Sequence, residues 1–557
     1  MRTCLLLVLG LSISVASADN GRPKTATWAT KPVGPDGPWN AVRVSIGGDS
    51  QPLMLFPGRL WQTIVPTSSY CSKNASTGHC TSGTYLKDKA VADQLNGIQF
   101  KTDVQDVMAG VQMKGKNLDT YSDTCDVVGE AVPNCSLALV DDQMMAYPGG
   151  QWFPLFAGCL SLGAGADNQS YGLPGRDLIN ATIFPWYLYR NGAVPSSSFG
   201  MHIGSASAAS PMQGSLSFGG FDRNRLTGDV LTLAGEPSTP VLLTDISIKV
   251  VRGPSPFDLS DKKANLLLKG NSSMPKTGIP VTLDGCSPYL TLPRTTCEGI
   301  SAHLPVTYNG SLGLYLWNTK DPRYKDIVNS ASVLSFSFMG SDNTKSVAVH
   351  VPFQHLNLTL EPPLVDEPVP YFPCSTGGTG SYVLGRAFLQ DAFLAGNWHK
   401  ETWWLGQAPG PNIPANADVV SMQPDDVSIR GSGNDWVASW DPIWSSLAAS
   451  NSGPSVPQGQ GAESKSDLGL STGGKAGISI GATAAVLVIL GALLIWWCKR
   501  KHGKQATQEP CQETYFREKE GMPGASMYEP KCVPYTPQIH ETSGKPVQIT
   551  QPVYELS

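Results

Sequence analysis

The residue types that most often hold metals and cofactors are present in this sequence, but their spacing predicts neither kind of site. The eight histidines are scattered, and the cysteines and histidines show no Cys-x-x-Cys or His-x-x-x-His spacing. A glycine-rich stretch, Gly377–Gly380, precedes a strand-like run and predicts a turn. We therefore expect no metal and no cofactor.

The charge balance bears on which partners are plausible. The formal net charge is −5 and 15% of the residues are charged, so no basic face is expected. Proteins that bind nucleic acid usually present a basic face to the phosphates. The composition therefore excludes nucleic acid as an expected partner.

Two apolar segments predict where the protein resides. Residues 5–15 follow Arg2 and end at the small-residue pattern Ala16-Ser17-Ala18, which predicts a secretory signal peptide over residues 1–18. Residues 476–497 carry no charge, and at about 1.5 Å per residue they cover a hydrocarbon core of about 30 Å. Two tryptophans and then the basic run 499–501 close this segment, which predicts a type I, single-pass membrane protein with a cytosolic C-terminus.

Cysteines and glycosylation motifs are distributed as an exported segment requires. Eight of the twelve cysteines lie between the two apolar segments, and an even number there indicates disulfide bonds: Cys71, Cys80, Cys125, Cys135, Cys159, Cys286, Cys297 and Cys374. The same region carries seven Asn-x-Ser/Thr motifs, which predict a glycoprotein: Asn74, Asn134, Asn168, Asn180, Asn271, Asn309 and Asn357.

The elements that must position any site are mostly strands. Residues 39–408 contain short alternating runs separated by Gly- and Asn-rich turns, and Asp177–Asn191 is one of few helical candidates. These roughly 370 residues are too many for one core, so we expect two β lobes, 39–213 and 214–408. Residues 409–475 are rich in Pro, Gly, Ser and Asp and predict a flexible stalk with an ordered patch at Asp435–Trp444. Residues 498–557 predict a disordered cytoplasmic tail.

Four stretches in order resemble the pepsin-type aspartic proteases. They are Gly214-Ser-Leu-Ser-Phe-Gly-Gly-Phe-Asp222 followed by Leu226–Val230, Val281-Thr-Leu-Asp-Gly-Cys-Ser-Pro-Tyr-Leu-Thr-Leu-Pro293, Tyr382-Val-Leu-Gly-Arg-Ala-Phe-Leu389 and, more weakly, Phe156-Ala-Gly-Cys-Leu-Ser-Leu-Gly163. The resemblance covers about 370 residues and implies an all-β, bilobal fold. The order of signal peptide, stalk, membrane segment and short tail is similar to that of fungal surface proteins.

The resemblance implies a catalytic pair, of which this chain keeps one member. In that family each lobe supplies one Asp, and the two carboxylates share a proton because like charges so close cannot both ionise. Asp284 corresponds to the acid of the second lobe, although Gly285 and Cys286 replace the residues that usually follow it. In the first lobe Phe56-Pro-Gly-Arg59 replaces the Asp-Thr-Gly-Ser motif, and no Asp or Glu occurs from Ser50 to Lys87.

A third catalytic element is also altered. The family's flap carries a tyrosine over the cleft, but residues 98–120 contain none. With one acid and no flap tyrosine, we expect no pepsin-type proteolysis. Asp284 is then either a structural remnant or a repurposed acid, and one hypothesis is that Arg59, in the opposite loop, forms a salt bridge with it. Phe56, Arg59 and Cys286 are the candidate cleft residues.

The resemblance also bears on the cysteines. Cys71 with Cys80, and Cys297 with Cys374, match bridges common in the family, and Cys125 with Cys135 is a local pair by elimination. Cys159 and Cys286 either pair across the lobes or remain free thiols.

Three functions are compatible with these features. The first is a non-catalytic cell-surface module that binds a peptide or glycan in the old cleft, or senses one. The second is a membrane-anchored aspartic endopeptidase acting at acidic pH, and the third is a structural surface glycoprotein. We favour the first, at the plasma membrane or cell surface, with the vacuolar membrane as the alternative.

Overall fold

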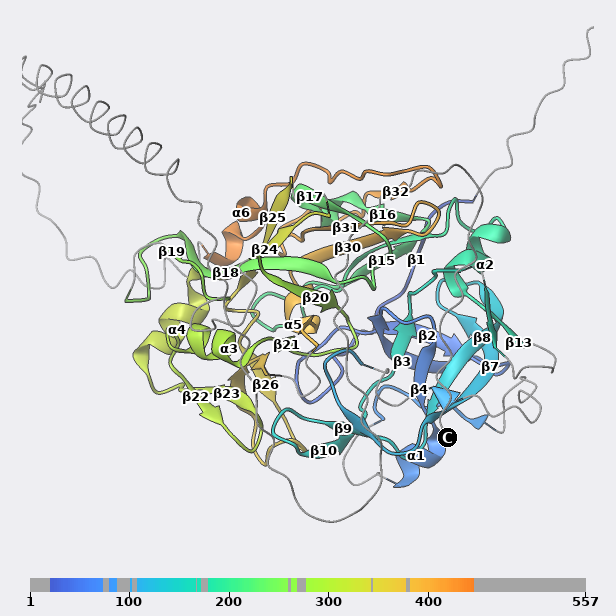
Figure 1. Cartoon of the computed structure of the whole chain (residues 1–557), viewed down its shortest axis with the longest axis horizontal. Helices are drawn as coiled ribbons and strands as arrows, with labels where there is room; N and C mark the ends of the chain where they lie inside the picture. The colour runs from blue at the N-terminus through green and yellow to red at the C-terminus, as the bar shows by residue number, and fades with distance from the viewer. Residues whose placement is uncertain are drawn as a thin grey trace, which may run out of the picture. The chain divides into compact units, whose positions relative to one another are not determined.

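The structure, a computed structural model, describes residues 21–73, 80–87, 101–102, 108–166, 168–171, 179–258, 262–267, 277–341, 344–376 and 381–444 (Figure 1). All of these residues belong to one unit, Met1–Val456. No helix within the described ranges is long and apolar enough to cross a membrane. The predicted signal peptide, membrane segment and cytoplasmic tail lie outside the described residues.

The described unit is mostly β, as the sequence predicts, and its first half forms a nine-stranded sheet. The sheet order is β12-β13-β8-β4-β11-β3-β2-β7-β5. Its strands are β2 (Val42–Ile46), β3 (Gln51–Gly58), β4 (Thr63–Pro66), β5 (Lys101–Thr102), β7 (Leu118–Asp126), β8 (Ala131–Val140), β11 (Cys159–Ser161), β12 (Asn168–Tyr171) and β13 (Ile179–Thr182). The small strands β6 (Met113–Lys114), β9 (Met144–Ala146) and β10 (Trp152–Pro154) form a separate sheet.

The second half builds a sheet of its own, in the order β25-β24-β18-β20-β29-β21-β28 with β19 on β18. Its strands are β18 (Val241–Arg252), β19 (Lys262–Lys263), β20 (Ile279–Leu283), β21 (Leu290–Thr291), β24 (Ala331–Met339), β25 (Ser346–Pro352), β28 (Cys374–Ser375) and β29 (Val383–Leu384). A four-stranded sheet lies beside it, with β22 (Val306–Asn309), β23 (Leu314–Trp317), β27 (Val369–Phe372) and β26 (Leu358–Leu360).

A six-stranded sheet joins the two halves. Its order is β1-β15-β14-β30-β31-β17, with β1 (Lys24–Thr25), β14 (Ser198–His202), β15 (Ser215–Phe218), β17 (Thr227–Ala234), β30 (Ala392–Asn397) and β31 (Thr402–Gln407). Figure 1 shows β2, β3, β7 and β8 on one side of the molecule, β18 and β24 on the other, and β30 and β31 above and between them. Strands from both predicted lobes therefore share one sheet.

Helices are short. They are α1 (Ser68–Lys73), α2 (Phe184–Arg190), α3 (Arg294–Ser301), α4 (Pro322–Asn329), α5 (Arg386–Leu389) and α6 (Trp436–Ser439). The candidate helix 177–191 is shorter than predicted, because Pro185 lies in the first turn of α2, where the missing N–H costs nothing. Ile179–Thr182, just before it, forms β13 instead.

The N-terminal segment ahead of β2 is part of the fold. Lys24–Thr25 pairs with β15 as an outer strand of the shared sheet. Further along, Gly37 O accepts a hydrogen bond from Thr359 N at 2.8 Å, and Pro35 O accepts one from Glu361 N at 2.7 Å. Residues 35–37 therefore lie along β26, in the second half of the molecule.

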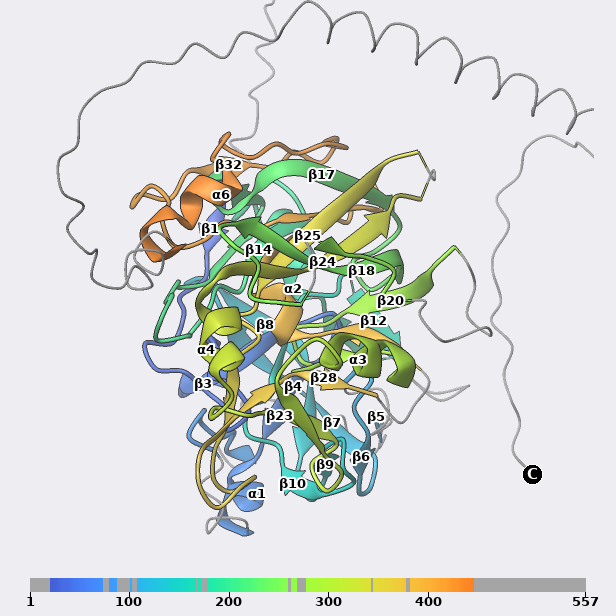
Figure 2. The same cartoon turned by 90° about the vertical axis from the view of Figure 1, so that its left-hand side faces the viewer.

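The predicted stalk boundary at residue 409 is wrong. Residues 409–444 are ordered and packed: β32 (Val419–Ser421) pairs with β16 (Gly220–Asp222), and the Met422 and Trp440 side chains are fully buried. Figure 2 shows this segment, with β32 and α6, along the side of the molecule that carries β17. Its Pro and Gly content suggested a spacer, but its apolar residues bury against the shared sheet and β25. The ordered patch expected at Asp435–Trp444 is present and is the end of a longer packed segment.

Candidate functional site

Asp284 lies at the end of β20, in the turn that leads to β21. Its backbone N–H donates to Leu384 O of β29 at 3.3 Å, which fixes the turn. The residue is only 2% exposed. Its Oδ1 accepts from Cys286 N at 3.0 Å, and its Oδ2 accepts from Ala109 N at 3.2 Å and from the Ser287 hydroxyl at 3.5 Å. Both oxygens of this acid are therefore engaged by the protein.

Arg59 provides the opposite charge, which the sequence analysis offered as one hypothesis. It follows Gly58 at the end of β3, and its Nε lies 3.8 Å from Asp284 Oδ2. The approach is close because Gly58 has no side chain: a Cβ there would lie 3.6 Å from Asp284 Oδ1 and 2.3 Å from Cys286 Sγ. The Arg59 side chain is 26% exposed, so it connects the buried acid to solvent.

Phe56 occupies the position in the first loop where the resemblance implies the missing acid. Its ring is buried on β3, with Cys159 of β11 as its parallel neighbour. The guanidinium of Arg386, the first residue of α5, lies 3.8 Å from the ring centroid. Arg386 Nη1 also donates to Gly285 O at 3.0 Å and to Cys286 O at 2.8 Å. A buried cation therefore bridges the two loops.

The charge of Arg386 is balanced by an acid that the sequence analysis did not single out. Burial lowers the pKa of Arg386, and the negative charge of Asp36 opposes that shift. Asp36 is 3% exposed and accepts from Trp39 Nε1 at 2.9 Å. The pKa values of three surrounding tyrosines are raised, mostly by burial and secondly by the negative charge of Asp36: Tyr147, Tyr289 and Tyr371. In sequence, Asp36 sits in a Pro- and Gly-rich run and resembles an ordinary turn residue.

The backbone of residues 108–110 lies directly over Asp284. Ala109 N donates to its carboxylate, and Ala109 O accepts from the Ser287 hydroxyl at 2.6 Å. At Gly110 an added Cβ would lie 2.9 Å from a Val383 methyl. This segment belongs to the region where the flap is expected. Of the three predicted cleft residues, only Arg59 reaches the surface; Phe56 and Cys286 are buried.

Three disulfide bonds are present among the described residues. Cys71–Cys80 and Cys297–Cys374 form as the resemblance implied, and Cys159–Cys286 joins the two halves at the candidate site. The predicted Cys125–Cys135 bridge is wrong, since both are buried free thiols. Cys125 lies opposite Val132 and Cys135 opposite Asp123, with a bulge between, so the two cysteines are diagonal neighbours on β7 and β8. A hydrogen bond with Cys135, and burial, raise the pKa of Cys125.

The predicted glycosylation sites differ in exposure. Asn134, Asn168 and Asn180 are exposed, whereas Asn309 and Asn357 are half-buried. The Asn309 side chain accepts from Ser311 N and Leu312 N, and the Asn357 side chain bonds the Tyr324 hydroxyl. Asn74 and Asn271 lie outside the described residues.

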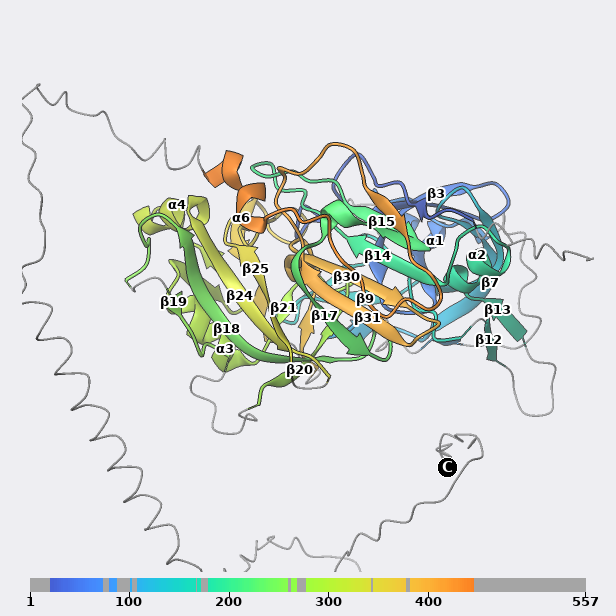
Figure 3. The same ribbon diagram turned by 90° about the horizontal axis from the view of Figure 1, so that it is seen from above.

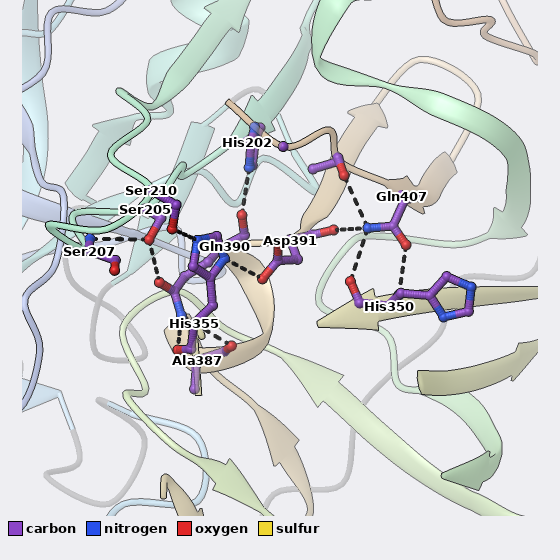
Figure 4. A network of polar contacts seen from close by, with 12 residues as sticks. His202, Ser205, Ser207, Ser210, His350, His355, Ala387, Gln390, Asp391 and Gln407 are labelled. Atoms are coloured by element: carbon purple, nitrogen blue, oxygen red, sulfur yellow. Dashed lines mark hydrogen bonds and ion pairs between the residues drawn. The ribbon is translucent and has the colours of Figure 1, made fainter. Parts of the chain in front are cut away.

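A second polar cluster, also missed from sequence, connects β14 and the turn that follows it with α5, β30 and the end of β25. His355 Nδ1 lies 2.8 Å from Asp391 Oδ2, and its Nε2 lies 2.8 Å from the Ser210 hydroxyl (Figure 4). This is the bonding order of a Ser-His-Asp triad, but all three residues are at most 3% exposed. Burial raises the pKa of Asp391, with His355 opposing. The cluster is suited to a structural role, in which it holds the turn after β14 against the segments that follow β25 and α5, because these three side chains do not face solvent.

The site as a whole cannot share a proton between two carboxylates. Among the described residues Asp284 faces Arg59 and backbone N–H groups, whereas the buried acid Asp36 accepts a hydrogen bond from Trp39 and its charge opposes the lowering of the Arg386 pKa. The described residues also contain no group of histidines, cysteines and acids that could hold a metal ion. The carboxylate of Asp284 is paired with Arg59, and the Cys159–Cys286 bond joins the two halves at the same place. The geometry therefore favours a charge-neutral structural site over an acid–base pair.

Comparison with known proteins gives a distant structural match. No protein family matches this sequence, and neither does any curated protein. Among solved structures, the crystal structure of aspartic proteinase from Irpex lacteus matches it with a TM-score of 0.40 and 12% sequence identity, covering 69% of this chain and 98% of that chain.

Proposed function

We propose that this chain is a catalytically degenerate member of the pepsin-type aspartic proteases, and that it acts as a non-catalytic binding or sensing module at the cell surface. The pairing of Asp284 with Arg59, where a second acid would be required, carries the proposal. A carboxylate that faces a cation and two backbone N–H groups has no second acid with which to share a proton, so the division into acid and base is lost.

Two further features support loss of proteolysis. Phe56 and the Arg386 guanidinium fill the first loop, so a ring and a cation stand where the acid that helps to activate water would be required. The segment 108–110 covers Asp284, so no substrate bond can reach its oxygens without moving that backbone.

The cellular setting is part of the proposal. The predicted signal peptide, the Asn-x-Ser/Thr motifs and the apolar segment 476–497 support a type I, single-pass glycoprotein of the plasma membrane or cell surface. Exposed Asn134, Asn168 and Asn180 are accessible to a glycosyltransferase. A peptide or glycan is the proposed ligand class.

A protease assay on the full-length chain tests the catalytic half of the proposal. The purified protein and its Asp284→Asn variant are incubated with a peptide library from pH 3 to pH 7, with and without pepstatin. We expect no cleavage that depends on Asp284. Cleavage that pepstatin blocks and Asp284→Asn abolishes would overturn the proposal, whereas cleavage equal in both proteins would identify a contaminant.

A further inference from the structure

A small sheet made of β6, β9 and β10 is separate from the larger sheets. Among the described strands these three pair only with one another. Gln112 O also accepts from Ala146 N at 2.8 Å, which extends the pairing toward residues 108–110. Figure 3 shows β9 in the middle of the molecule, with β18 and β24 of the second half on one side and β7 and β13 of the first half on the other. The segment over Asp284 and the β9–β10 hairpin are therefore parts of one hydrogen-bonded body.

Residues 108–110 make the first contact of this body with the second half. Ala109 N donates to Asp284 Oδ2 at 3.2 Å, and Ala109 O accepts from the Ser287 hydroxyl at 2.6 Å. Gly110 has a φ of +70°, and a Cβ there would lie 2.9 Å from a Val383 methyl, so a glycine is required for the backbone to lie this close. One residue of the first half thus offers its N–H and its C=O to a buried acid and a hydroxyl, which is the pair of groups that a bound peptide would offer.

The turn of the β9–β10 hairpin makes the second contact. Gly149 N donates to Leu312 O at 3.0 Å, in the turn between β22 and β23. A Cβ at Gly149 would lie 1.9 Å from Ser311 O, and one at Gly313 would lie 2.4 Å from the carbonyl carbon of Pro148. Backbone therefore packs directly on backbone, and a methyl group added at either glycine would force the two turns apart.

The opposite end of the body is tied to the first half. The buried Tyr70 hydroxyl of α1 donates to Gln143 O at 2.9 Å and accepts from Leu155 N at 2.6 Å, so it holds both ends of the β9–β10 hairpin. Gln143 Nε2 donates to Lys116 O at 2.7 Å, which ties the segment after β6 to the same place. Gly115 lies against Gln143 with a φ of +128°, a conformation that favours glycine. A body that is bonded at its base and docked through glycines at its far end has the construction of a lid.

We propose that β6, β9 and β10, with residues 108–112, form an autoinhibitory lid that moves as one body and keeps Asp284 and Ser287 occupied by the chain itself. In the closed state Ala109 fills the hydrogen-bonding positions that the main chain of a peptide ligand would take, so a peptide reaches this site only when the lid lifts from the second half. Such a lid reduces the apparent affinity in proportion to the fraction of molecules that are open. The inference rests on the binding role proposed above and states how that site is regulated.

Amide hydrogen exchange on the full-length chain, followed by mass spectrometry, tests whether the lid moves as one body. Gly149→Ala places a methyl group against Ser311 O and undocks the hairpin turn. Gly310→Ala, in the turn that the hairpin contacts, is the matched control, because nothing lies within 4 Å of its Cβ position. We expect Gly149→Ala to raise exchange at least tenfold in residues 144–150 and also in residues 109–114, and to leave β7 and β8 unchanged. Gly310→Ala should leave all of these segments as in the wild type.

A second variant loosens the lid at its other contact. Ser287→Ala removes the hydrogen bond to Ala109 O, and it keeps the test decisive if thermal unfolding shows that Gly149→Ala is not folded. It should raise exchange in the same two segments. Faster exchange confined to the segment next to each substitution, or no change in either variant, would overturn the inference.

An array of eight-residue peptides separates the lid from the binding function. Binding should be at least tenfold tighter in Gly149→Ala than in the wild type and in Gly310→Ala, because the closed state no longer competes with the peptide. Equal binding by all three proteins would overturn the lid alone. No peptide binding by any of them would overturn the regulatory role together with the peptide as the proposed ligand.

Discussion

At the scale of single residues, the buried charges of the candidate site have compensating partners within the protein. A buried carboxylate without a second acid needs a cation or several N–H donors, and Asp284 has both. Arg386 likewise lies over the Phe56 ring and is compensated by Asp36 and two carbonyl oxygens. The buried charges of Asp284 and Arg386 are therefore each compensated by neighbouring groups.

The first prediction concerns Asp284 as a structural residue. Asp284→Asn should lower the free energy of unfolding by about 2–4 kcal/mol, because the new amide cannot accept from both Ala109 N and Cys286 N and leaves Arg59 unpaired. Urea unfolding at neutral pH measures the change. Glu298→Gln, in the exposed pair with Arg294, is the control and should change little. A stability equal to wild type would show that the carboxylate is dispensable to the fold.

The second prediction concerns two histidines that the fold keeps neutral. Burial lowers the pKa of His350 to about 4 and that of His202 to about 3. A lowered histidine pKa means that the unfolded chain binds protons more readily, so stability is present above pH 6.5 and is lost as the pH falls through these values. Between pH 7 and pH 4, His350→Gln should lose about 1–3 kcal/mol less than wild type. The raised pKa of Asp391 acts in the opposite direction in both proteins.

Urea unfolding of both proteins at pH 7 and pH 4 checks this difference. An equal loss in wild type and variant would mean that His350 does not contribute to the pH dependence.

Single residues also mark the limit of what sequence could predict at this site. Asp284, Phe56 and Arg59 were identifiable because a motif fixes their place in two matching loops, and their proximity follows from that alignment. Arg386 lies in a recognisable motif, but its role depends on Phe56, 330 positions away, and on Asp36. Local composition carries no information about contacts between residues so far apart in sequence. The contacts among Ser210, His355 and Asp391 could not be predicted for the same reason.

At the scale of elements, alternation and turn chemistry predicted the strands well, but composition misplaced one boundary. Pro, Gly and Ser are frequent in residues 409–444, which is typical of a spacer. Their few large apolar residues nevertheless pack: Trp440 stacks on Trp444 at 5.4 Å and meets the His355 ring at 5.0 Å. A sparse set of tryptophans can order a segment whose average composition indicates flexibility.

The third prediction tests this segment. Trp440→Ala should destabilise the fold by about 3–5 kcal/mol, because removing a fully buried indole leaves a cavity against His355 and Trp444. Thermal or urea unfolding measures the loss. Val427→Ala, at a side chain that is 57% exposed in the same segment, should have almost no effect. If Trp440→Ala also matches wild type, the burial of Trp440 contributes nothing to stability, and the ordered patch expected at Asp435–Trp444 is not held by this side chain.

At the scale of the whole molecule, the two halves are held together in three ways. The six-stranded sheet takes strands from both, residues 35–37 lie along β26, and Cys159 is bonded to Cys286 across a separation of 127 residues. In the chain-entropy account, a loop of this length contributes about 4–5 kcal/mol to stability.

The fourth prediction concerns the Cys159–Cys286 disulfide bond. A protease recognition sequence inserted between Ala208 and Ala209, in an exposed turn, allows the chain to be cut between its halves. Cys71–Cys80 lies wholly before the cut and Cys297–Cys374 wholly after it, so among the described disulfides only Cys159–Cys286 can hold the pieces together. After cutting, a denaturing gel should show one band without reductant and two with it. Cys159→Ser with Cys286→Ser should give two bands in both lanes. Two bands from the unsubstituted protein without reductant would show that the halves are not covalently joined, and they would then be held by the shared sheet and by the contact of residues 35–37 with β26.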